Sequence, residues 1–246
     1  MTKETIVDHF RMMTIETKNC SHRHIIFLHG GAYVCEANLV HRMMAEKFAD
    51  RGFRVTAFDY PMAPEHTAVY TNQWIVTAYK ELINRYPDDV FYVFGDSAGG
   101  GLSVIFLMLL RDQGIQPVPQ KSVLASPWLD VSMSNPEIEC VYKNDIMLSY
   151  DALVYTGKEY AGKLGTTSPY VSPIYGNLND LGEILMFYSS NEIFVPDFEK
   201  FVQLIRQAIG TSITAHKEEG LFHCYLMWPT LRQSKEAFAK MVAFLK

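Results

Sequence analysis

Residues 90–101 read VFYVFGDSAGGG, and this stretch decides the fold. An aromatic and β-branched run leads into a glycine-rich turn, and an apolar run over residues 98–112 follows it. This order predicts a strand, a tight turn and a helix. The turn contains G-x-S-x-G, with Ser97 between Gly95 and Gly99. Such a turn lifts a serine hydroxyl above the sheet, at the positive end of the next helix. We therefore expect Ser97 to be a nucleophile.

Two other interpretations of this turn remain open from the motif alone. A glycine-rich turn between a strand and a helix can cradle a phosphate, but G-K-[ST] does not follow, and the glycines do not fit the dinucleotide pattern G-x-G-x-x-G. The turn can also be a plain tight turn in which Ser97 caps the helix. The context of the motif favours the nucleophile.

Short strand-like runs alternate with amphipathic stretches on both sides of this turn, which is typical of βαβ units around a mostly parallel sheet. We expect one α/β domain over residues 1–246, with helices on both faces of the sheet. Residues 128–181 lack a clear strand, contain one helix-like segment near 150–160, and are predicted to be an insertion that covers the site. The expected strands are residues 24–28, 54–58, 90–94, 121–125, 184–189 and 212–216. The expected helices are residues 39–50, 71–85, 98–112, 197–209 and 231–245.

The composition excludes several classes of protein. The net charge of −5 gives no basic excess with which to bind nucleic acid. The longest apolar run, residues 102–110, is too short to cross a bilayer, and the acidic residues near the N-terminus do not fit a signal peptide. We therefore expect a cytoplasmic protein without membrane insertion. The four widely spaced cysteines are expected to be free thiols: Cys20, Cys35, Cys140 and Cys224.

A second glycine-rich loop follows the strand at residues 24–28. It reads His29-Gly30-Gly31-Ala32-Tyr33, and adjacent glycines let backbone N–H groups approach a substrate oxygen. We expect the N–H groups of Gly31 and Ala32, together with that of Ala98, to form an oxyanion hole. Alone, the loop could simply turn the chain. Its position upstream of G-x-S-x-G favours the catalytic interpretation.

The remaining members of a catalytic triad follow from chain order, which in enzymes with this turn is Ser, acid, His. Only His216 and His223 come after Ser97. His216 lies in a strand-like run, whereas His223 lies in the loop before the last helix, so we expect His223 to be the base. Glu192 comes directly after the strand at residues 184–189 and is expected to be the acid. Asp197 is the alternative acid, although capping the next helix would suffice to explain it.

Five segments of the chain then resemble the hormone-sensitive-lipase-like branch of the α/β-hydrolase family, which includes bacterial short-chain esterases and plant carboxylesterases. These segments are His29-Gly30-Gly31-Ala32, Asp59-Tyr60-Pro61-Met62-Ala63-Pro64-Glu65-His66, Gly95-Asp96-Ser97-Ala98-Gly99-Gly100, Ser126-Pro127-Trp128-Leu129-Asp130 and Ser172-Pro173-Ile174-Tyr175-Gly176. The resemblance implies the α/β-hydrolase fold and an acyl-enzyme mechanism. Three features depart from the family. Ala32 replaces a glycine, Glu192-Ile193-Phe194 replaces Asp-Pro-Leu, and only 28 residues precede His29, which implies a reduced cap and a more open site.

The sequence thus predicts a serine carboxylesterase that hydrolyses short-chain esters and needs neither a cofactor nor a metal. The expected partner is a small-molecule ester, and a homo-oligomer is left open. Residues 128–181 are too rich in charge for a lid that docks on lipid, which favours short acyl chains. Two alternatives remain. One is an amidase, arylformamidase or peptidase that uses the same residues, and the other is a non-catalytic binding protein on the same scaffold.

Overall fold

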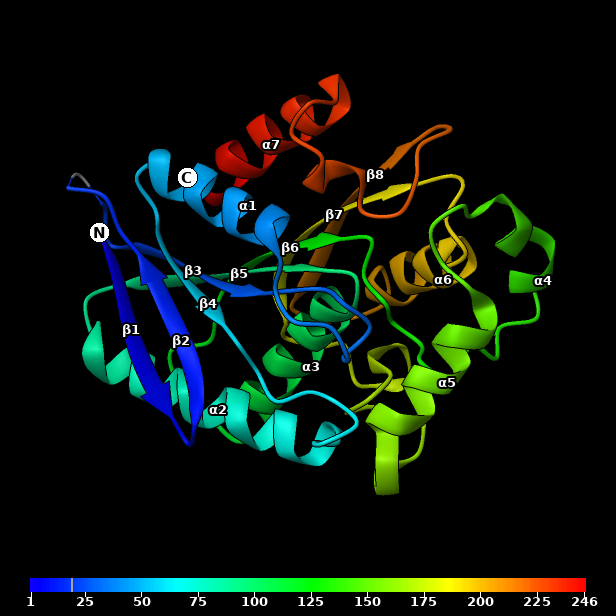
Figure 1. Ribbon diagram of the computed structural model, residues 1–246, viewed down its shortest axis with the longest axis horizontal. Helices are drawn as coiled ribbons and strands as arrows, with labels where there is room; N and C mark the ends of the chain where they lie inside the picture. The colour runs from blue at the N-terminus through cyan, green and yellow to red at the C-terminus, as the bar shows by residue number, and fades with distance from the viewer. Residues whose placement is uncertain (19) are drawn as a thin grey trace.

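The computed structural model describes residues 1–18 and 20–246, which form an eight-stranded sheet with helices on both faces (Figure 1). The strand order is β1-β2-β4-β3-β5-β6-β7-β8. The strands are β1 (Thr2–Val7), β2 (Phe10–Ile15), β3 (Arg23–Leu28), β4 (Arg54–Phe58), β5 (Val90–Asp96), β6 (Lys121–Ala125), β7 (Gly182–Ser189) and β8 (Thr211–Glu218). The helices are α1 (Leu39–Asp50), α2 (Ala68–Arg85), α3 (Ala98–Asp112), α4 (Ile138–Val141), α5 (Tyr150–Ala161), α6 (Val195–Ile205) and α7 (Arg232–Leu245), with 3₁₀ turns η1 (Tyr142–Asn144), η2 (Gly162–Leu164), η3 (Pro173–Tyr175) and η4 (Tyr225–Met227).

The six strands predicted from the sequence all form, and they pair in parallel from β4 to β8. Strands buried on both faces read as continuous apolar runs, which explains why β3 could be recognised. Two separate clusters of buried side chains cover the sheet. One contains side chains of α1, α7 and η4, and the other contains those of α2, α3 and α6. The predicted α/β layering is therefore present in the structure.

A hairpin that the sequence analysis did not predict extends one edge of the sheet. Strands β1 and β2 pair antiparallel, and β2 pairs antiparallel with β4. The turn between β1 and β2 is formed by Asp8 and His9, both with positive φ (44° and 69°). Asn-Gly and Asp-Gly are the sequences that usually mark such turns. Because no glycine occupies this turn, the hairpin could not be recognised from its residues alone.

The segment predicted as an insertion leaves the sheet after β6 and returns at β7. It carries α4, α5 and the turns η1, η2 and η3, and it lies beside α6 at the right of Figure 1. The helix expected near residues 150–160 is α5, and Ser149 caps it by accepting a hydrogen bond from the N–H of Ala152. Among the helices of residues 1–18 and 20–246, none is long and apolar enough to cross a membrane.

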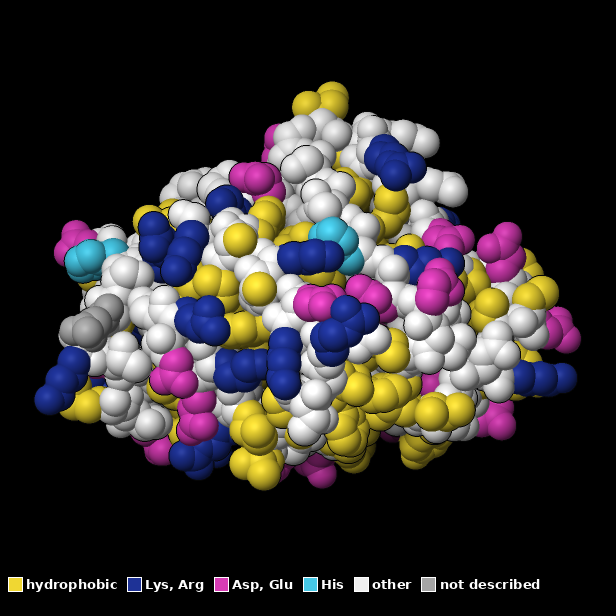
Figure 2. All heavy atoms as spheres, turned by 90° about the horizontal axis from the view of Figure 1, so that it is seen from above, with side chains coloured by type: hydrophobic (Ala, Val, Ile, Leu, Met, Phe, Trp, Pro, Cys, Tyr) yellow, Lys and Arg dark blue, Asp and Glu magenta, His cyan; other side chains and the backbone are white. Residues whose placement is uncertain are grey.

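Cationic side chains gather on the outer face of α1 and α7, which Figure 2 shows from above. Lys47 and Arg51 both lie over the ring of Phe238, with the Lys47 nitrogen 4.4 Å from the ring centroid. Partial burial and the nearby charges of Arg51 and Lys235 lower the pKa of Lys47. The long side chains thus cover apolar surface with their stems while their charges remain close together.

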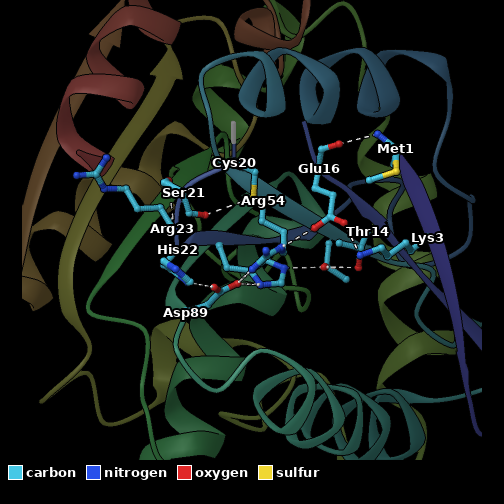
Figure 3. A network of polar contacts seen from close by, with 12 residues as sticks. Met1, Lys3, Thr14, Glu16, Cys20, Ser21, His22, Arg23, Arg54 and Asp89 are labelled. Carbon is cyan, nitrogen blue, oxygen red and sulfur yellow. Dashed lines mark hydrogen bonds and ion pairs between the residues drawn. The ribbon is translucent and has the colours of Figure 1, made fainter. Parts of the chain in front are cut away.

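A polar network joins the amino ends of the parallel strands, at the edge opposite to the Ser97 turn (Figure 3). Asp89, just before β5, accepts a hydrogen bond from His24 Nδ1 (3.0 Å) and pairs with Arg54 at the start of β4. Arg54 also contacts Glu16, just after β2, at 3.0 Å. Burial lowers the pKa of His24 and favours the neutral ring, so with Nδ1 donating to Asp89, Nε2 accepts from Thr56 Oγ1 (2.7 Å). The network ties the hairpin edge to the central strands.

Asp89 depends on this network for its charge. Burial by itself raises its pKa, but the hydrogen bonds from His24 and Arg54 more than offset this and lower the pKa to about 2. Because the pKa in the folded protein lies below the ordinary value of 3.8, the stabilisation by ionised Asp89 is present above pH 3.8. It is lost as the pH falls through about 2.

We predict that Asp89→Asn lowers the free energy of unfolding at pH 7 by about 3 kcal/mol, because it removes one of the two carboxylates that pair with the largely buried Arg54. The difference from the wild type should shrink as the pH falls towards 2. Urea unfolding at several pH values measures this. Asp88→Asn, at the exposed neighbour, is the control and should change little. Equal losses for both variants would contradict the assigned role of the network.

Candidate active site

Ser97 stands at the turn between β5 and α3, in a strained conformation with φ 51° and ψ −121°. The turn closes because two glycines permit close backbone contacts. A Cβ on Gly95 would lie 2.3 Å from the carbonyl oxygen of Gly99, and a Cβ on Gly99 would lie 2.0 Å from that of Leu28. The Ser97 carbonyl accepts the N–H of Trp128 (2.8 Å), which fixes the turn against the segment after β6.

The structure brings Ser97, His223 and Glu192 together. Ser97 Oγ lies 2.9 Å from His223 Nε2, and His223 Nδ1 lies 2.7 Å from Glu192 Oε2. The three residues follow β5, β8 and β7, and the carboxyl ends of parallel strands meet at one edge of a sheet. Since a carboxylate only accepts, Nδ1 carries a proton and Nε2 of the neutral ring is free to accept from Ser97. This is the geometry of a nucleophile, a base and an orienting acid.

Glu192 is fully buried, and its second oxygen also has partners. Oε1 accepts hydrogen bonds from Ser126 Oγ (2.8 Å) and from the backbone N–H of Ser189 (2.5 Å). A buried carboxylate is tolerated only where donors replace its lost hydration. The hydrogen bonds at both oxygens therefore favour an ionised Glu192 facing His223.

His223 is buried and lies next to the buried thiol of Cys224. Burial alone lowers the pKa of His223, and the hydrogen bond to the Glu192 carboxylate opposes this effect because it stabilises the protonated ring. Burial raises the pKa of Cys224 to about 11. Cys224 is therefore a neutral thiol at pH 7 and not a competing nucleophile.

The loop predicted as an oxyanion hole faces the Ser97 turn. A Cβ on Gly31 would meet the carbonyl oxygen of Cys35 at 2.5 Å, and φ of Gly31 is 124°, so this position requires glycine. Ala32 also has positive φ, at 53°. Among the described residues, no hydrogen-bond acceptor takes the N–H of Gly31, Ala32 or Ala98. The three N–H groups that the sequence predicts for the oxyanion hole are therefore not used by acceptors within the described chain.

Asp96 joins this loop to the Ser97 turn, a role that the sequence analysis missed. Its Oδ1 accepts the N–H of Gly30 (3.0 Å) and its Oδ2 lies 3.2 Å from His41 Nε2. His41 also accepts the N–H of Asn38 (3.0 Å), which completes a capping box at the start of α1. The D of G-D-S-A-G was the only signal for Asp96, and it gave no indication of the partner.

His216 and Asp197, the alternative base and acid, do not take part in the contacts between Ser97, His223 and Glu192. His216 lies in β8, as expected, and its ring stacks on Phe187. The prediction that Asp197 caps the following helix was wrong. Helix α6 begins at Val195 with Phe194 as its N-cap, because Pro196 is tolerated in the first turn and allows the helix to start earlier. Asp197 lies buried in that first turn, where it accepts from Asn135 (2.8 Å).

Comparison with known proteins gives the family. Residues 25–227 match the family model described as the alpha/beta hydrolase fold. The chain belongs to the α/β hydrolase family. This hydrolase is 30% identical over 227 residues to an acetyl-hydrolase of Streptomyces hygroscopicus, which covers 91% of this chain and 75% of the relative. It is 28% identical over 225 residues to an esterase of Acinetobacter venetianus, which covers 89% of this chain and 73% of the relative.

A solved structure agrees with the sequence relatives. It is an esterase from the bacterial hormone-sensitive lipase family, with a TM-score of 0.91 and 27% identity. The match covers 100% of this chain and 83% of that one. The predicted family, fold and class of enzyme are therefore confirmed.

The burial of the Asp197 carboxyl group is poorly compensated, which predicts that its contribution to stability depends on pH. Oδ2 has no hydrogen-bond partner within the described residues, and burial raises the pKa of Asp197 from 3.8 to about 6. Since the pKa is raised in the folded protein, the stabilisation by the protonated form is fully present below pH 3.8. It is lost as the pH rises through about 6.

We expect Asp197→Asn to remove this pH dependence while keeping an acceptor for Asn135. Relative to the wild type, the variant should gain stability between pH 4 and pH 8, by about 3 kcal/mol from the difference between the two pKa values. Thermal unfolding at both pH values tests this. Asp151→Asn, at an exposed carboxylate in the first turn of α5, is the control. If the relative stability of Asp197→Asn does not change with pH, the assigned burial cost is wrong.

Proposed function

We propose that this hydrolase is a serine carboxylesterase in which Ser97 is the nucleophile, His223 the base and Glu192 the acid. The observation that carries the proposal is the continuous line of hydrogen bonds from Glu192 through His223 to Ser97. His223 removes the proton of Ser97 as its oxygen attacks the ester carbonyl, and Glu192 holds the ring in the required tautomer and stabilises the imidazolium.

The negative charge that develops on the carbonyl oxygen needs donors that are already in place. The free N–H groups of Gly31, Ala32 and Ala98 supply them, and Ala98 is also the first residue of α3, at the positive end of the helix. His223 then returns the proton to the leaving alcohol. Water, activated by the same imidazole, hydrolyses the acyl-enzyme.

Two alternative functions use the same scaffold. An amidase, arylformamidase or peptidase would differ in the leaving group, and a panel of matched esters and amides separates these activities from an esterase. A non-catalytic binding protein would not need the Ser97–His223 contact of 2.9 Å. The names of the relatives, an acetyl-hydrolase and an esterase, favour ester hydrolysis.

We predict that Ser97→Ala loses several orders of magnitude in kcat on p-nitrophenyl acetate and keeps its fold. Glu192→Gln should also lower kcat severely, because the amide stabilises the wrong tautomer of His223 and cannot stabilise the imidazolium. Asp197→Asn is the matched control and should retain near-wild-type kcat. Turnover by folded Ser97→Ala at the wild-type rate, or inactivity of Asp197→Asn alone, would overturn the assignment. EDTA should leave the rate unchanged.

We further propose that the substrates carry short acyl groups. In this proposal the chain forms a single domain, and residues 128–181 act as a cap over the active site. A row of buried rings supports this. The ring of Tyr160 in α5 stacks on that of Tyr33, with 3.7 Å between the ring centroids. Tyr33 in turn stacks on Trp128 (5.8 Å between centroids), and Trp128 stacks on Phe194 (5.9 Å). Phe194 contacts the ring of His223 edge to face, at a centroid distance of 5.6 Å. These four aromatic residues are at most 1% exposed, so bulky side chains close off this side of His223 from solvent.

We expect kcat/KM of the wild type to peak at or below about four acyl carbons and to fall by about eight, because each methylene adds about 0.8 kcal/mol only where it can be buried. Tyr160→Ala opens space behind Tyr33 and should move the optimum to longer chains, with a loss of stability of about 3 kcal/mol. A series of p-nitrophenyl esters measures this. Tyr155→Ala, at an exposed position on the same helix, should keep the wild-type profile. A wild-type profile that still rises at eight carbons would contradict the proposal.

A further inference from the structure

Ser126 lies directly after β6 and follows Ala125, whose carbonyl oxygen accepts the N–H of Ser97 (2.8 Å). It is 1% exposed, and its φ of 46° places it in the left-handed region, which is rare for a residue with a side chain. Its N–H donates to the carbonyl oxygen of Phe187 in β7 (2.8 Å). The backbone thus directs this side chain towards the loop that carries Glu192.

The hydroxyl of Ser126 makes two hydrogen bonds in a fixed direction. It lies 2.8 Å from Glu192 Oε1 and 3.1 Å from the backbone nitrogen of Cys224. The N–H of Cys224 can only donate and an ionised carboxylate can only accept. The single hydroxyl proton of Ser126 therefore points at Glu192, and the Ser126 oxygen accepts the N–H of Cys224.

These two contacts join the loop of the acid to the loop of the base. Cys224 follows His223 directly and has a φ of 54°, so holding its N–H fixes the backbone that carries the imidazole. Ser126 and the N–H of Ser189 together occupy Oε1 of Glu192, which leaves Oε2 for His223. A glutamate has one more rotatable bond than an aspartate, so it needs this extra restraint to hold one orientation.

We propose that Ser126 is a positioning residue that sets Glu192 and His223 at their working distance. The proposal rests on the proposed function, since it acts only through the pair Glu192–His223. Ser126 touches neither the substrate nor Ser97 in this role. It therefore affects the rate of the chemical step and not the binding of the ester.

A double-mutant cycle on p-nitrophenyl acetate hydrolysis tests the proposal. Ser126→Ala should lower kcat by up to about a hundredfold with KM unchanged. In the Glu192→Gln background, the same change should lower kcat by less than about twofold, because the carboxylate that Ser126 positions is already absent. A loss that multiplies fully with that of Glu192→Gln would show that Ser126 acts independently, and would overturn the proposal.

Ser122→Ala is the matched control, because Ser122 is a buried serine in the preceding strand β6 and its hydroxyl has no partner within the described residues. It should keep wild-type kcat. Ser126→Gly is the second variant, because glycine adopts positive φ without strain and should fold where Ser126→Ala does not. It should show the same loss of kcat, and wild-type kcat in a folded Ser126→Gly would overturn the proposal.

The cycle also distinguishes this proposal from the proposed function. Wild-type kcat in Glu192→Gln would overturn Glu192 as the acid, and with it the role of Ser126. A severe loss in Glu192→Gln together with a multiplicative loss in the double variant would overturn the role of Ser126 alone.

Discussion

The left-handed turn at Ser97 requires β5, β3 and the first turn of α3 to approach more closely than side chains allow. A Cβ on Gly99 would lie 2.0 Å from the carbonyl oxygen of Leu28, so any larger residue would push α3 away from the sheet. That shift would break the hydrogen bond between the Ser97 carbonyl and Trp128, where the insertion begins. It would also move the N–H of Ala98 relative to the loop at Gly31. The nucleophile, the oxyanion donors and the start of the insertion thus depend on one backbone contact.

The rest of the site is held by hydrogen bonds between loops that follow different strands. Asp96 after β5 holds Gly30 after β3, and Ser126 after β6 links the loops after β7 and β8. The parallel sheet brings these loops to one edge, but strands alone do not fix side chains to within a few tenths of an ångström. Buried carboxylates with several donors do, because each hydrogen bond restricts a rotation and offsets part of the desolvation cost.

Local patterns in the sequence were sufficient for most elements and for the residues that chain order defines. Strands β4 and β6 and helices α1 and α3 have the predicted bounds, because each joins a clear apolar pattern to a turn or a cap. The β1–β2 hairpin and the start of α6 were missed, since Asp8-His9 and Pro196 gave weak or misleading signals. Asp96, His41 and Ser126 could not be assigned roles, because their partners lie far along the chain and become neighbours only in the folded protein.

Two buried carboxylates five positions apart follow β7, Glu192 in the loop and Asp197 in the first turn of α6, and only their donors distinguish them. Glu192 accepts from Ser126, from the N–H of Ser189 and from His223, whereas Asp197 accepts only from Asn135 and leaves Oδ2 without a partner among the described residues. An ionised acid is therefore supported at Glu192, while burial raises the pKa of Asp197 to about 6. Sequence position alone makes both plausible acids. The surroundings that each side chain meets in the folded protein decide which one can stabilise an imidazolium.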